Sequence, residues 1–332
     1  MLSKHYVSRS KYFAASEFKR KSRLAAAKIF AQACSKFIFS TLMPILLLAN
    51  VYATTAAAFL DNGLSARSEG LARAFTAVAD DLDAFYFNPA GYGIQTKTRV
   101  NTLFAKNRNI ENVVYAGYGQ ALGNGYGAVN VYSGGVDGIP LTTYDKDKGR
   151  VADSGSSFSA VNRAVMISYG EPLSGITNYP AEWSWGVSLK YIQETLYKSN
   201  ASGAGLDAGL LYKNGHLTCG WSVINLLEPQ LTWDTGAVDV AERQQRFGLA
   251  YRFFDVFLIS GELNICPDRT LTGLGGEYTL LEFVTLRAGT FTEHYALGLG
   301  FNYAGLQLDC AYLVPTDYLI EPTQKISIGY IF

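Results

Sequence analysis

Histidine and cysteine, the residues that most often serve as nucleophiles, bases and metal ligands, are scarce in this 332-residue sequence. There are three histidines and four cysteines, and Cys219, Cys266 and Cys310 are too far apart in sequence for a zinc pattern. His216 and His294 are predicted at opposite ends of the folded domain, so neither has the setting of a catalytic base. We therefore expect no enzymatic activity, no metal and no cofactor.

Positive charge is also scarce outside the first 53 residues. Nine of the 28 Lys and Arg residues, but only one of the 28 Asp and Glu residues, lie in residues 1–53, which leaves 19 basic and 27 acidic side chains. Binding to a phosphate backbone depends on clustered Lys and Arg. The acidic balance therefore excludes nucleic acid as a partner.

Long apolar runs are missing, apart from one short stretch near the start. Residues 37–53 carry no charge and contain the apolar run 42–48, which is interrupted by Pro44. This stretch is shorter than the ~20 residues that a spanning helix requires. Because it follows a basic region and ends in Ala53, we interpret residues 1–53 as a basic leader and signal peptide. A start codon placed too far upstream would explain the long leader.

The C-terminal residues alternate between apolar and polar or small side chains up to Tyr330. Even positions 326–332 hold isoleucine, tyrosine and phenylalanine, whereas Lys325, Ser327 and Gly329 occupy the odd ones before Ile331. A strand points successive side chains to opposite faces, so one face suits lipid and the other a polar lumen. The alternative is an edge strand of a soluble sandwich. The terminal Phe332 also resembles the signal that outer-membrane assembly machinery recognises.

The same alternation recurs through residues 99–332, where we count fourteen strands. They span residues 99–107, 111–121, 124–134, 158–170, 183–196, 204–213, 216–226, 244–253, 256–266, 271–280, 283–291, 294–303, 305–314 and 324–332. Long connections at 135–157, 227–243 and 315–323 all fall at one end, and short turns at the other, with 171–182 as the exception. An even strand number and this asymmetry predict a 14-stranded antiparallel transmembrane β-barrel in lipids of the bacterial outer membrane.

Residues 54–98 precede the first strand and do not alternate. Residues 72–83 favour helix, and Asn88-Pro89-Ala90-Gly91 is a turn that ends it. The runs Ala-Phe-Thr-Ala-Val-Ala-Asp-Asp at 74–81 and Asn-Pro-Ala-Gly at 88–91 resemble the hatch of the FadL-like outer-membrane barrel superfamily. They are most similar to its PorV/PorQ and UPF0164 branch, although residues 70–73 depart from the Gly-Met-Gly-Gly of that branch. The resemblance implies that residues 54–98 form a hatch or plug.

Candidate site residues follow from the hatch motif and from strand parity. The hatch or ligand-binding candidates are Arg67, Phe75, Asp80, Asp81, Asn88, Pro89, Ala90 and Gly91. The charged residues with inward parity, which we expect to line the lumen, are Lys190, Asp207, Arg246, Arg252, Glu262, Glu277, Arg287 and Asp309. Hatch charges such as Arg73 and Asp83 would need partners among them, because isolated charges in a narrow lumen are costly. The alternative is that these charges only line water.

The resemblance implies two functions. As a FadL-type transporter, the protein would let hydrophobic small molecules of the fatty-acid or hydrocarbon class diffuse through a plugged lumen. As a PorV-like accessory, it would shuttle or anchor exported proteins together with secretion components. Apolar patches in the predicted outer loops suit either partner; they are residues 139–141, 226–227, 231–233 and 318–320. We favour uptake.

Overall fold

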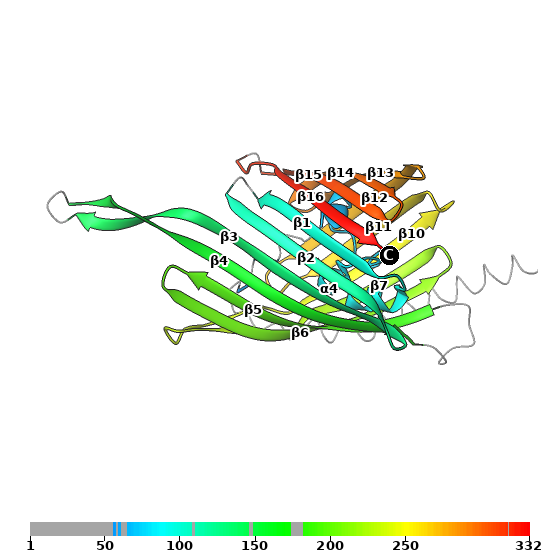
Figure 1. The fold of residues 1–332 in the computed structure, drawn as a ribbon, viewed down its shortest axis with the longest axis horizontal. Coiled ribbons are helices and arrows are strands. Elements are labelled where there is room, and N and C mark those ends of the chain that lie inside the picture. The colour runs from blue at the N-terminus through cyan, green and yellow to red at the C-terminus, as the bar shows by residue number, and fades with distance from the viewer. Residues whose placement is uncertain are drawn as a thin grey trace, which may run out of the picture. The chain divides into compact units, whose positions relative to one another are not determined.

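Fourteen antiparallel strands form a closed barrel in the computed structural model (Figure 1), as the sequence predicted. The structure describes residues 56–57, 59–60, 65–107, 110–145, 149–173, 182–317 and 319–332; the leader and signal peptide lie outside them. The barrel strands are β1 (Arg99–Asn107), β2 (Glu111–Leu122), β3 (Gly125–Asp145), β4 (Arg150–Pro172), β5 (Glu182–Leu196), β6 (Ser199–Asn214), β7 (Leu217–Leu227), β10 (Gln244–Phe253), β11 (Phe257–Ile265), β12 (Thr270–Leu281), β13 (Val284–Phe291), β14 (His294–Tyr303), β15 (Leu306–Pro315) and β16 (Thr323–Ile331).

The barrel closes because its first and last strands pair. Strand β1 runs antiparallel to β16, from Arg99 opposite Ile331 to Lys106 opposite Gln324. The other neighbours pair in chain order, and β7 pairs with β10. The C-terminal alternation therefore belongs to a closing strand, and the edge strand of a sandwich is excluded.

The β3–β4 hairpin is longer than predicted and projects beyond the barrel (Figure 1). Most of the predicted loop 135–157 is strand, and the ladder continues to Asp145 opposite Arg150. Alternation stops there because neither face of the projecting hairpin is covered by lipid or lumen. We call this end of the barrel the hairpin rim, and the opposite end, at Phe332, the C-terminal rim.

The predicted loop 227–243 also contains strands. Short strands β8 (Gln230–Trp233) and β9 (Val238–Val240) pair with each other, and β8 continues the sheet beside β6. The indole Nε1 of Trp233 donates a hydrogen bond of 2.7 Å to Asp239 and ties the two strands together. At three and four residues, these strands are too short for periodicity to reveal.

The outer face of the barrel is apolar. On β14, Tyr295, Leu297 and Leu299 are 50–60% exposed, whereas the alternating Ala296 is 2% exposed. This is the pattern of a wall between lipid and lumen, and it places the protein in the bacterial outer membrane. None of the helices in the described ranges is long and apolar enough to span a membrane.

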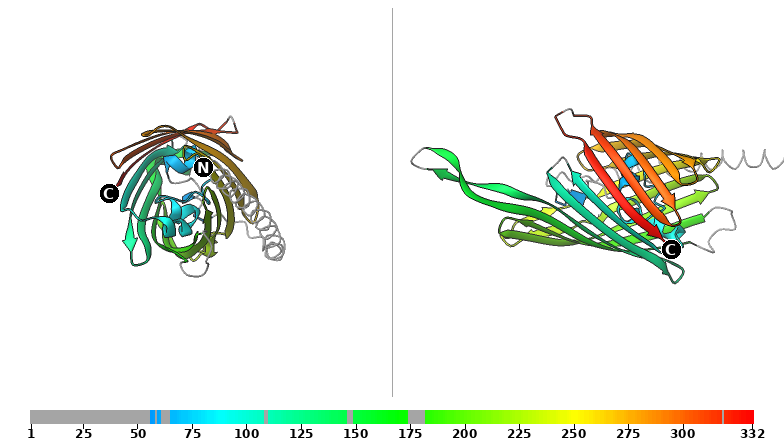
Figure 2. Two further views of the ribbon diagram at one scale, coloured as in Figure 1. Left: turned by 90° about the vertical axis from the view of Figure 1, so that its right-hand side faces the viewer. Right: turned by 45° about the horizontal axis from the view of Figure 1, so that its top comes forward.

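The N-terminal segment, residues 65–98, lies inside the ring of strands (Figure 2). It contains helices α3 (Ala66–Gly70) and α4 (Ala84–Phe87) and the 3-10 helix η3 (Pro89–Ile94). The helix expected over residues 72–83 does not form; they make turns, with positive φ at Ala72, Arg73 and Ala79. Contacts with the barrel outweigh helix propensity there, since both the N–H and the hydroxyl of Thr76 donate to Glu262 of the wall.

Candidate functional site

Asn88 fastens the N-terminal segment to the wall formed by β5, β6 and β7. Its amide Nδ2 donates to the carbonyl oxygens of Thr76, at 3.1 Å, and of Leu210 in β6, at 3.0 Å. Its Oδ1 accepts from the N–H of Ala90 at 3.1 Å and caps η3. The Asn-Pro turn thus has a physical role that its position in the sequence did not reveal.

Two glycines let the backbone of this turn touch the wall. A Cβ at Gly186 would collide with the carbonyl of Pro89, and a Cβ at Gly209 would collide with the side chain of Asn88. Nearby, Ser184 donates to the carbonyl of Ala90 at 2.8 Å. This half of the segment is held by uncharged groups in close backbone contact.

The other half of the segment meets the opposite wall through ion pairs. Arg67 contacts Asp80, Asp81 at 2.9 Å and, in β12, Glu277 at 3.3 Å. The wall continues this network, because Arg287 lies 2.8 Å from Glu277 and 2.6 Å from Asp309. Arg252 is at its edge, 3.9 Å from Glu277. The structure therefore brings Arg67 together with both aspartates of the hatch motif.

Glu69 of α3 is the centre of a second charged cluster. Its carboxylate lies 3.0 Å from Nζ of Lys325 in β16, 3.3 Å from Arg73 and 3.8 Å from His294. Burial alone would raise the pKa of Glu69, but the positive charges of Arg73 and Lys325 lower it to about 2. Glu69 was not among the predicted site residues; its place one helical turn before Arg73 was the only signal.

Asp83 has a different environment from the other hatch acids. It is fully buried, and its Oδ2 accepts a hydrogen bond of 2.8 Å from Ser68. The other oxygen, Oδ1, has no hydrogen-bond partner among the described residues. Burial, with the negative charge of Asp81, raises the pKa of Asp83 to about 8. The charged partner expected for Asp83 is not found among the described residues, where Ser68 is its hydrogen-bond donor.

Aromatic residues of the segment contact two of the predicted charges, Arg246 and Arg67. Arg246 in β10 donates to the carbonyl of Tyr86 at 3.0 Å, and its guanidinium lies 4.4 Å from the centre of the Tyr86 ring. Phe75 packs against Phe87 with ring centres 5.3 Å apart and lies beneath the guanidinium of Arg67.

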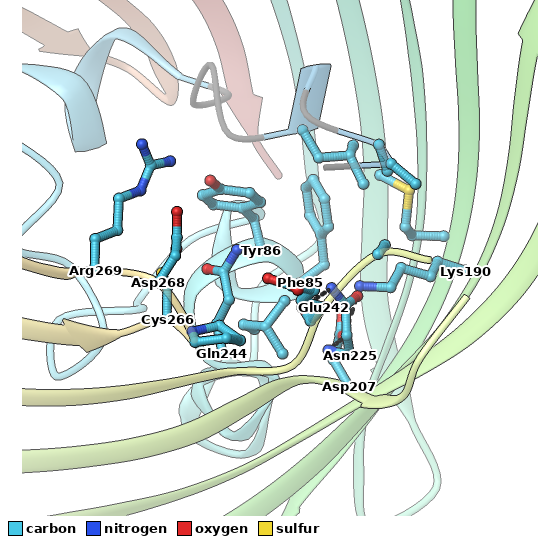
Figure 3. Close-up of a pocket in the computed structure, with 17 residues that line it drawn as sticks. Phe85, Tyr86, Lys190, Asp207, Asn225, Glu242, Gln244, Cys266, Asp268 and Arg269 are labelled. Carbon is cyan, nitrogen blue, oxygen red and sulfur yellow. Dashed lines mark hydrogen bonds and ion pairs between the residues drawn. The ribbon is translucent and has the colours of Figure 1, made fainter. Parts of the chain in front are cut away.

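A small pocket lies between the segment and the wall on the side of the hairpin rim (Figure 3). Its volume is about 60 Å³, and Phe85, Tyr86 and Lys190 line it. Lys190 lies 2.7 Å from Asp207, which also accepts the N–H of Asn225 at 2.6 Å. That N–H is available because the β6–β7 ladder shifts register between Leu206 and Ala208. We call this cavity the lumen pocket.

A larger, apolar recess of about 470 Å³ lies at the hairpin rim. Its lining residues are Leu141, Phe158, Leu196, Tyr197, Ser199, Trp233, Thr235 and Ala237. Phe158 and Leu196 have the same parity as the buried Ala164 and Ile192 of their strands, so the recess continues the inner wall. We call it the rim recess. It unites two of the apolar patches predicted for separate loops, because β8 carries Trp233 beside β6.

Solved structures with this fold are known, whereas no protein-family model and no curated protein matches the sequence. The toluene transporter TbuX of Ralstonia pickettii aligns with a TM-score of 0.61 at 13% identity, over 81% of this chain and 98% of that one. The toluene transporter TodX of P. putida gives 0.58 at 13%, over 81% and 99%. A FadL homologue of Pseudomonas aeruginosa gives 0.53 at 9%, over 81% and 98%. At these identities the likeness shows a shared fold.

Proposed function

We propose that this protein is a FadL-like channel through which hydrophobic small molecules cross the outer membrane by diffusion. The observation that carries the proposal is the rim recess, an apolar cavity at the mouth of a barrel with the fold of two toluene transporters. Its volume of about 470 Å³ is in the range of small-molecule sites. Such a recess concentrates apolar solutes because it removes their surface from water.

Passage beyond the recess requires movement of the N-terminal segment. The lumen pocket, at about 60 Å³, is smaller than the roughly 150 Å³ cavity that holds a benzene ring. Phe85 and Tyr86 of the segment form part of its lining. We propose that residues 54–98 act as the hatch, that Arg67, Phe75, Asp80 and Asp81 belong to its movable half, and that residues 88–91 anchor it.

Two finer assignments remain predictions. Membership of the PorV/PorQ and UPF0164 branch rests on the hatch motif of residues 65–91 alone. Nothing in the described part of the chain favours the alternative role as an accessory of protein secretion.

Binding of toluene to the protein in lipid nanodiscs tests the proposal. Leu141→Asn and Leu196→Asn place an amide in the rim recess, and Leu319→Asn is the matched control because Leu319 is 78% exposed outside it. We expect each recess variant to bind toluene about 10-fold more weakly, since an unpaired amide replaces apolar surface. Equal binding by wild type and both recess variants would refute the role of the recess.

A further inference from the structure

A band of polar side chains crosses the outer wall of the barrel, on the face that meets lipid. From strand to strand its members are Gln324 on β16, Lys106 on β1, Asn112 on β2, Ser133 on β3, Arg163 on β4 and Gln193 on β5. Lys106 is paired across the sheet with Gln324 and Asn112. Arg163 is paired in the same way with Ser133 and Gln193. Each cation is thus flanked on both sides by neutral hydrogen-bonding groups.

The band marks the edge of the apolar wall nearest the hairpin rim. Beneath Lys106 on the same face lie Phe104 and, on β16, Ile326, which are 55% and 48% exposed. Beneath Arg163 lie Val165 and, on β5, Tyr191, which are 40% and 47% exposed. In outer-membrane barrels the short turns face the periplasm and the long loops face outward. The band therefore lies at the level of the outer-leaflet headgroups.

The two cations of the band have no counter-charge in the part of the chain that the structure describes. Among the described residues, neither Lys106 nor Arg163 forms an ion pair or a side-chain hydrogen bond, and no member of the band is acidic. At the same end of β12 and β13 the outward residues are Thr272 and Thr290. The wall at β12 and β13 therefore carries no cation at this level.

We propose that this band binds the phosphate-bearing headgroup of an outer-leaflet lipid. The guanidinium of Arg163 suits two parallel hydrogen bonds to a phosphate, and Lys106 supplies a compact second charge. Amides and the Ser133 hydroxyl donate to the remaining oxygens, while acyl chains lie on the apolar residues beneath. Strands β1 and β4 are three strand spacings apart, about 14 Å, and Arg163 lies two residues along the ladder from the row of Lys106. A headgroup with two phosphates therefore spans both cations, with their long side chains covering the offset.

Native mass spectrometry with bisphosphorylated lipid A as the probe tests the proposal. The double variant Lys106→Gln/Arg163→Gln keeps the length and polarity of the band but removes both charges. A cation at a membrane surface strengthens anionic-lipid binding about 5-fold, so we expect binding about 25-fold weaker in the double variant. Arg150→Gln, at the exposed end of the β3–β4 hairpin, is the charge-matched control and should bind as wild type does.

Two further measurements separate the possible sources of binding. A phosphate-free analogue with the same acyl chains should bind about 25-fold more weakly than lipid A, and inorganic phosphate should not displace lipid A. Equal binding of the analogue would show acyl contact alone and overturn the proposal. Displacement by inorganic phosphate would show a site for the free ion and overturn the lipid assignment. Each variant is first checked for folding by circular dichroism, and the single variants replace a double variant that does not fold.

Discussion

Nζ of Lys325 lies 3.0 Å from Oε1 of Glu69, so the closing strand of the barrel is ion-paired with the first helix of the N-terminal segment. Both side chains are almost fully buried, at 2% and 0% exposure. The pair joins residues 256 positions apart in the sequence. Strand β16 therefore forms part of the membrane wall and also holds the N-terminal segment through this ion pair.

Removal of the carboxylate should destabilise the protein. Glu69→Gln leaves the positive charges of Lys325 and Arg73 facing a neutral amide, which should lower the free energy of unfolding by about 3 kcal/mol. Urea unfolding in lipid vesicles measures the change. Glu282→Gln, in the exposed turn between β12 and β13, is the control and should change it by less than about 0.5 kcal/mol. A Glu69→Gln variant as stable as the control would show that the pair contributes nothing.

Asp83 should make the protein less stable as pH rises. Its pKa is raised from 3.8 to about 8, so between these values the folded protein holds a proton that the unfolded chain has released. Stability from this group is therefore complete below about pH 4 and is lost by about pH 8. Asp83→Asn keeps a neutral group there and should flatten this part of the pH profile, measured as thermal unfolding from pH 4 to 9. An unchanged profile in Asp83→Asn would contradict the assignment.

Glu69 should have the opposite effect at low pH. Its pKa is lowered from 4.5 to about 2, so between these pH values the carboxyl is ionised in the folded protein and still protonated in the unfolded chain. The stability it contributes is present above about pH 4.5 and is lost as pH falls toward 2. Glu69→Gln should remove this acid-side loss and leave the Asp83 profile in place. Identical acid-side profiles for the wild type and Glu69→Gln would count against the strength of the cluster.

A methyl group at Gly186 or Gly209, the two wall glycines that contact the Asn-Pro turn, should displace residues 88–91 of the segment. Gly186→Ala and Gly209→Ala place a Cβ against Pro89 and Asn88, at a cost of about 1–3 kcal/mol. We expect higher conductance in planar bilayers. At Gly261, also in a strand, the nearest atom to a new Cβ would be the Gly273 carbonyl oxygen at 4.0 Å, so Gly261→Ala should conduct as wild type does. Equal conductance in all four proteins would show that the segment does not limit flow.

Asn88→Ala tests the same anchor without adding atoms. It removes three hydrogen bonds of the segment, worth about 3 kcal/mol together. Backbone amides of residues 76–91 should then exchange with deuterium faster. Asn302→Ala, at an exposed position near the C-terminal rim, is the control. Unchanged exchange in Asn88→Ala would mean that other contacts hold the segment.

The barrel was predictable from sequence because lipid and lumen impose a period of two on every spanning strand. Where that constraint ends, prediction failed: the β3–β4 hairpin beyond residue 135 and strands β8 and β9 carry no alternation. The N-terminal segment was harder, since Thr76 is bonded to Glu262 of the wall instead of to its own helix. Inward parity identified Lys325 as a lumen residue, but its partner Glu69 could not be predicted, because the register of the segment against the wall is set by the fold.

Uptake of radiolabelled toluene by intact cells tests the central claim most directly. The account predicts faster uptake in cells that contain the wild-type protein than in cells without it. Leu196→Asn should reduce this gain about 10-fold at equal amounts of protein in the membrane, and Leu319→Asn should leave it unchanged. Uptake equal to that of cells lacking the protein would contradict the account.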